Sequence, residues 1–98
     1  LRGKLGKKIY ETGILYMKLD EFESAKMTFQ SVMDMYYDTE IIQLAYQGMV
    51  EALAKNKEID EAKGLLSKHE NILVESGLYD DAAKTIEKMQ KTILKASN

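Results

Sequence analysis

The chain has 98 residues, which suits one domain with a modest core. Hydrophobic residues make up 45% of it and charged residues 31%, the proportions of an ordinary folded protein. The absence of cysteine excludes thiolate catalysis and cysteine metal sites. The formal net charge of −2, with both signs interspersed, argues against a nucleic-acid-binding protein.

No apolar run approaches the roughly 20 residues that a membrane-spanning helix needs, so no transmembrane segment is predicted. The chain opens at Leu1 without a methionine or a signal peptide. We therefore expect a processed form or an expressed fragment, from which targeting information has been removed.

Apolar residues recur at helical spacing throughout the chain, and proline is absent. Five helices are expected, at about 5–18, 21–36, 40–55, 59–75 and 79–95. The connections between them are short, so consecutive helices should be antiparallel neighbours. The predicted fold class is all-α.

Several helix ends carry recognisable end signals. Asp20 is expected to cap the second helix, with Glu23 completing an approximate capping box. Asp38 and Thr39 should cap the third helix. The third and fourth helices are expected to end at Asn56, in a left-handed conformation, and at Gly77.

A small residue inside the first predicted helix indicates tight packing. Gly13 costs about 1 kcal/mol there relative to alanine. We expect a neighbouring backbone to approach closely at this position, on a stripe that includes Leu5, Ile9, Thr12, Gly13 and Tyr16.

An internal repeat is the strongest pattern in the sequence. Ala25 and Ala62 lie 37 residues apart, and each is preceded at three residues and followed at four by a large apolar residue. This pattern resembles the tetratricopeptide repeat (TPR), a helix pair of about 34 residues. The matching positions are Gly13, Tyr16, Phe22, Ala25 and Phe29 in the first copy, Ala62 and Leu66 in the second, and Ala82 in a last helix.

The resemblance implies a single TPR-like domain over residues 1–98, folded as a right-handed solenoid of helical hairpins. Repeat one would cover about 5–37 and repeat two about 39–75. A helix at about 78–96 would then cap the last exposed apolar face.

A narrower resemblance covers Phe29 to Leu53, which is similar to a segment of BamD-like tetratricopeptide lipoproteins. It implies a subunit of the outer-membrane β-barrel assembly machinery on the periplasmic side, lipid-anchored if the full-length protein carries a lipobox. Its partners would be the other subunits of that complex. The alternative is a cytosolic TPR adaptor or secretion chaperone that binds a partner segment in its concave groove.

The TPR register also predicts which residues would line such a groove, because the first helix of each pair forms the concave face. This predicted concave face consists of Lys7, Tyr10, Ile14, Met17, Leu44, Gln47 and Glu51. Tyr10, Ile14, Met17 and Leu44 would form an exposed apolar strip, the kind of surface that binds a partner. Filling of the strip by another helix is the competing interpretation.

No catalytic, cofactor or metal site is predicted. The single histidine, His69, lies on an apolar stripe and is expected to pack there. Acidic clusters at 20–23, 58–61 and 80–81 fall at helix starts, where capping accounts for them. A small helical enzyme would need His69 to meet two or more of these acids, so the chain is expected not to be an enzyme.

Overall fold

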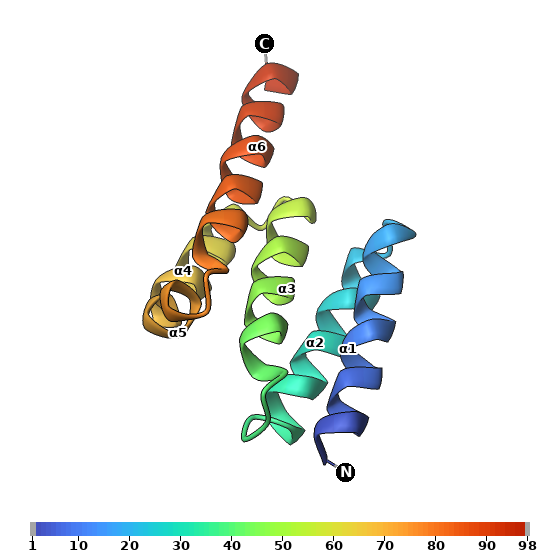
Figure 1. The fold of residues 1–98 in the computed structure, drawn as a ribbon. Coiled ribbons are helices and arrows are strands. Elements are labelled where there is room, and N and C mark those ends of the chain that lie inside the picture. Colours follow the sequence, from blue (N-terminus) through green and yellow to red (C-terminus); the bar gives the residue numbers. More distant parts are fainter. Residues whose placement is uncertain (1, 98) are drawn as a thin grey trace.

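The computed structural model describes residues 2–97, and every regular element in this range is an α-helix. The all-α prediction is therefore confirmed. The helices are α1 (Arg2–Lys18), α2 (Phe22–Met35), α3 (Ile42–Lys55), α4 (Ile59–Lys68), α5 (Glu70–Glu75) and α6 (Tyr79–Ser97). The long helices alternate in direction along the chain, and the body is flat, with extents of 50 × 28 × 17 Å (Figure 1).

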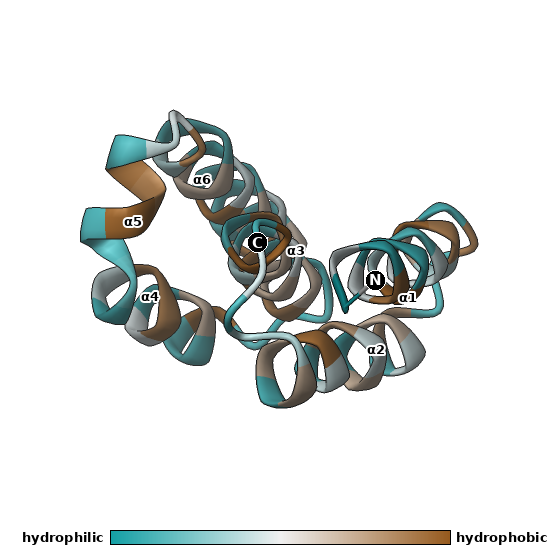
Figure 2. Ribbon diagram, turned by 60° about the horizontal axis from the view of Figure 1, so that its bottom comes forward, coloured by the Kyte–Doolittle hydropathy of each residue, from teal (hydrophilic) through white to brown (hydrophobic). Residues whose placement is uncertain are grey.

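The helices form two layers. Helices α1, α3 and α6 make one layer, while α2 and α4 make the other (Figure 2). Helix α2 packs against both α1 and α3, and α4 packs against both α3 and α6. Helix α3 contacts every other helix, which explains why it is buried on two faces.

The element boundaries follow the sequence pattern with one clear exception. The single helix expected at 59–75 is broken at His69, whose backbone (φ −111°, ψ 23°) leaves the helical region. The break lets α5 turn while Leu66 and Leu73 both stay in the core that α4 and α5 share with α3 and α6. The first helix also begins earlier than predicted, at Arg2.

The ring of Phe29 is the centre of the N-terminal half of the core. Phe29 is fully buried, and a Cβ atom added at Gly13 would lie 2.5 Å from its ring. A Cβ atom added at Gly48 would lie 2.7 Å from the same ring. The ring is therefore held between α1 and α3, at two places where only glycine fits.

This arrangement corrects the prediction for Gly13. The close neighbour is the Phe29 side chain and not a backbone. Gly48 was not predicted as a core position, although Ala45, Gly48 and Ala52 form a stripe of small residues at helical spacing on α3. All three are buried, and they let α2 approach α3 closely.

Most of the predicted repeat signature lies in the core. Fully buried are Ala25, Phe29, Ala62 and Ala82, and Leu66 is 7% exposed. Tyr16 packs half-buried against the cluster of Ala25, Phe29 and Ala52. Leu5 and Thr12, by contrast, are exposed, so their placement on the core stripe of the first helix was wrong.

Three turns share one backbone geometry. Asp20, Lys57 and Gly77 have φ angles of 57°, 68° and 75°, in the left-handed region. In each turn the next residue donates its amide to a carbonyl five residues back, at 2.9 Å: Glu21 to Tyr16, Glu58 to Leu53, and Leu78 to Leu73. These are Schellman motifs, which satisfy carbonyls at a helix C-terminus.

The shared turn also fixes where the next helix packs. The fully buried alanines Ala25, Ala62 and Ala82 each follow the left-handed residue by five positions. Each alanine also donates its amide to the residue that follows the left-handed one. The repeat detected in the sequence is therefore a turn and the first helical turn after it.

Several predicted helix-end signals were wrong. Asp20 closes α1 in a left-handed conformation instead of capping α2. Lys57, not Asn56, takes the left-handed conformation after α3. The N-cap residue of α3 is Ile41, so no side-chain bond caps this helix, and the Thr39 hydroxyl donates to the Tyr36 carbonyl at 2.7 Å.

The Phe29 arrangement makes Gly13→Ala destabilising. The added methyl group collides with a ring that is enclosed on both sides, and such overpacking costs about 1–3 kcal/mol. Gly64→Ala is the matched control, because Gly64 is also inside a helix but nothing lies within 4 Å of its added Cβ. That control should stabilise the domain by about 0.5–1 kcal/mol. Denaturant unfolding of the two variants should move in opposite directions; equal shifts would refute the packing.

The three turns predict a second pair of opposite effects. Gly77→Ala places a side chain in the left-handed region and should cost roughly 1–2 kcal/mol. Lys57→Gly removes that strain and should stabilise the domain by up to about 1 kcal/mol. Thermal melts of both variants test this, and a destabilised Lys57→Gly protein would contradict the turn geometry.

Candidate partner-binding groove

An open groove lies between the N-terminal part of α1 and the segment that leads into α3. Its volume is about 770 Å³. Its walls come from the start of α1, from the loop before α3, and from the first turn of α3: Gly3, Lys4, Lys7, Asp38, Thr39, Glu40, Ile41, Gln43 and Leu44. The groove shares Lys7 and Leu44 with the predicted concave face.

A polar clamp holds one wall of this groove. The Arg2 guanidinium contacts the Asp38 carboxylate at 2.8 Å and donates to the Met35 carbonyl at 2.5 Å. It also lies 5.4 Å from the centre of the Tyr36 ring. Hydrogen bonding to Arg2 lowers the pKa of Asp38. No local pattern in the sequence indicates this clamp, because its two ends are 36 residues apart.

The rest of the predicted concave face lies further along α1 and α3. Tyr10, Ile14 and Met17 are half-buried against the clusters around Phe29, and Leu44 is half-buried against Val32 and Tyr36. The Tyr10 ring lies 5.7 Å from the Phe29 ring. The apolar strip is therefore less exposed than the pattern predicted, and part of it supports the core.

An acidic residue of the predicted concave face, Glu51 on α3, influences residues of the two neighbouring helices α1 and α6. Burial raises the pKa of the Glu51 carboxyl, and the nearby Asp81 raises it further. Burial and the charge of Glu51 both raise the pKa of Tyr10. Glu51 on α3 is thus within electrostatic reach of both α1 and α6, and Gln47 donates a hydrogen bond to it. The predicted concave residues Gln47 and Glu51 lie together.

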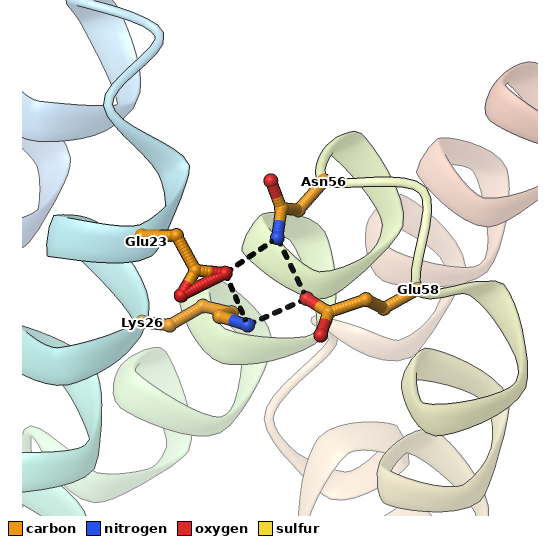
Figure 3. Close-up of polar contacts among 4 residues, drawn as sticks. All are labelled: Glu23, Lys26, Asn56 and Glu58. Carbon is orange, nitrogen blue, oxygen red and sulfur yellow. Dashed lines mark hydrogen bonds and ion pairs between the residues drawn. The ribbon is translucent and has the colours of Figure 1, made fainter.

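The acidic residues at the starts of α2 and α4 take part in a network that the sequence analysis did not predict. Lys26 contacts Glu58 at 2.6 Å and Glu23 at 2.9 Å, and the Asn56 amide donates to both carboxylates at 2.8 Å (Figure 3). Neither α2 nor α4 has a side-chain cap bond, so capping does not explain these acids. The network ties the start of α2 to the turn between α3 and α4.

His69 packs against an aromatic ring. Its imidazole stacks on the Tyr46 ring, with centroids 3.6 Å apart and planes 10° apart. Burial and the neighbouring charge of Lys68 lower its pKa below 6.5. The stack joins α3 to the break between α4 and α5. Among residues 2–97, no group of three or more histidine, aspartate or glutamate side chains is placed to hold a metal ion.

Within residues 2–97, no helix has the length and apolar character to cross a membrane. The chain matches no protein-family model, and no curated protein is significantly similar to it.

The stacked histidine predicts a pH dependence of stability. A lowered pKa in the folded state means that the unfolded chain binds the proton more readily, so stability is highest above about pH 6.5 and is lost as the pH falls through the folded-state pKa. His69→Phe keeps an aromatic stack but removes the titration. Unfolding free energies at pH 7.5 and 5.5 should therefore fall more in the parent than in His69→Phe. Glu51 acts in the opposite direction but is present in both proteins, and equal losses would contradict the prediction.

Proposed function

We propose that this chain is a non-catalytic scaffold of the TPR type that binds a partner protein through the groove between α1 and α3. The observation that carries the proposal is the repeated unit of turn and buried alanine, found at Asp20–Ala25 and again 37 residues later at Lys57–Ala62. Each unit joins the two helices of one hairpin, and the first helices of the two hairpins, α1 and α3, lie in one layer and border the open groove (Figure 2).

The proposed partners are other subunits of the outer-membrane β-barrel assembly machinery, and the proposed location is the periplasmic side of that membrane. The support for this step is the similarity of Phe29–Leu53 to BamD-like lipoproteins. The two ends of that segment pack together, because the ring of Phe29, its first residue, lies against Gly48 near its end. The segment therefore builds the scaffold, and the groove next to it would do the binding.

The runner-up is a cytosolic TPR adaptor or secretion chaperone, which could use the same groove for a partner segment. A small helical enzyme is the weakest candidate, because His69 is stacked on Tyr46 and, within residues 2–97, belongs to no group of three or more histidine and acidic side chains that could hold a metal ion. Two observations separate the first two candidates: the reading frame upstream of Leu1 and the fraction in which the native protein occurs. An export signal ending in a lipid-modified cysteine supports the outer-membrane assignment, and a native cytosolic start refutes it.

The groove is tested by filling it. Nothing lies within 4 Å of a Cβ added at Gly3, so Gly3→Phe can place a ring over the groove without disturbing the core. Binding of the purified barrel-assembly subunits should weaken by about tenfold or more, a loss typical of blocking a central contact. Calorimetric titration measures it.

Gly64→Phe is the matched control, since Gly64 is an equally open glycine on α4, a helix that does not contact α1. It should bind like the parent. Equal affinity of the Gly3→Phe protein would remove the groove from the proposal, and no affinity of the parent for any of these subunits would refute the partner.

A further inference from the structure

The side of the α1–α2 hairpin that faces away from α3 carries an unusual number of exposed apolar residues. On α1, Leu5 and Leu15 are 53% and 54% exposed, and Leu19, just after the helix, is 60% exposed. Together with Lys8 and Thr12 they follow one another at steps of three and four, which places them on one stripe. We call this stripe and its neighbours on α2 the outer hairpin face.

On α2, the outer hairpin face consists mainly of small side chains that protrude little. Ser24, Thr28 and Ser31 are half-buried, and Met35 beside them is 54% exposed. The Thr28 and Ser31 hydroxyls donate to carbonyls four residues back in their own helix, at 2.8 and 3.1 Å. The surface therefore offers small side chains, with the Thr28 and Ser31 donors already satisfied, next to protruding leucines.

This shape suits a helix. On its other side, the same hairpin already holds α3, which packs against both α1 and α2. The outer hairpin face is the opposite side of the same seam. Among the described residues, four of the eight exposed large hydrophobic side chains lie on it, namely Leu5, Leu15, Leu19 and Met35. Clustering of this kind marks an interaction surface.

The basic residues around these leucines indicate the charge that a partner would carry. Helix α1 has five basic residues and one acid. Lys4, Lys8 and Lys18 are exposed on or beside the stripe, and none of them forms an ion pair among residues 2–97. A second copy using the same face would bring these lysines together, which is unfavourable. A helix with acidic residues beside its apolar stripe would pair with them.

We propose that the outer hairpin face binds an acidic amphipathic helix of a partner protein, with the partner's apolar stripe against Leu5, Leu15 and Leu19 and its carboxylates near Lys4, Lys8 and Lys18. Of these residues, only Lys4 also lines the groove between α1 and α3. The proposal for the groove and the proposal for the outer hairpin face can therefore be refuted separately.

The test uses the whole chain and two fluorescent peptides of about 20 residues, enough for a helix of about 30 Å. Both peptides carry leucines at steps of three and four; one has glutamates beside them and the other has lysines. Fluorescence anisotropy should show the glutamate peptide binding about tenfold or more tightly than the lysine peptide, with an affinity that falls as salt rises. Equal binding of the two peptides, or binding of neither, would overturn the proposal.

Variants of the chain locate the binding. Leu15→Asp should abolish binding of the glutamate peptide, and Lys8→Glu should weaken it while improving binding of the lysine peptide. Leu94→Asp is the matched control, because Leu94 is 65% exposed on α6, and it should leave binding unchanged.

Gly3→Phe should also leave binding of the glutamate peptide unchanged. Loss of binding in Gly3→Phe alone would assign the peptide to the groove, and a dimer in light scattering that Leu15→Asp dissociates would assign the face to a second copy; either result refutes the proposal.

Discussion

The enclosure of one aromatic ring sets the arrangement of the N-terminal half of this protein. Phe29 extends from α2 between α1 and α3, and it reaches both helices at a glycine. A methyl group at either glycine would push a helix away from the ring. The close approach therefore depends on the absence of two side chains as much as on the presence of one. Because α1 and α3 also border the open groove, the same contact fixes the groove's two sides.

The turns supply the second constraint. Three Schellman motifs end α1, α3 and α5 with the same hydrogen bonds, and the next helix begins directly after each. A buried alanine follows each turn at a fixed distance, so the following helix packs closely as soon as it begins. Repetition of this unit, and not of a whole helix pair, is what the chain shows three times. The third copy comes sooner after the second because α4 and α5 are short.

Ion pairs and hydrogen bonds join helix ends and turns at the edges of the helical packing. Lys26 joins the start of α2 to the turn before α4, and Arg2 joins the start of α1 to the loop before α3. Both link segments more than 30 residues apart in the chain. The Lys26–Glu58 pair is partly buried and the Arg2–Asp38 pair is exposed; exposed pairs add little stability individually. Their contribution here is positional, since the Arg2 contact holds a loop that lines the groove.

Local pattern alone determined the helices and most of the core of this protein. Apolar spacing predicted the all-α fold, and the repeated alanines identified Ala25, Ala62 and Ala82, because burial on one face of a helix leaves a periodic trace in the sequence. Tertiary structure decided the rest. Gly48, the Lys26 network and the His69–Tyr46 stack each join residues far apart in the chain, and no local spacing records such pairs. The ends of α1 and α3 at Lys18 and Lys55 were predicted, but the left-handed residues that follow them, Asp20 and Lys57, were not, because neither residue favours that conformation by itself.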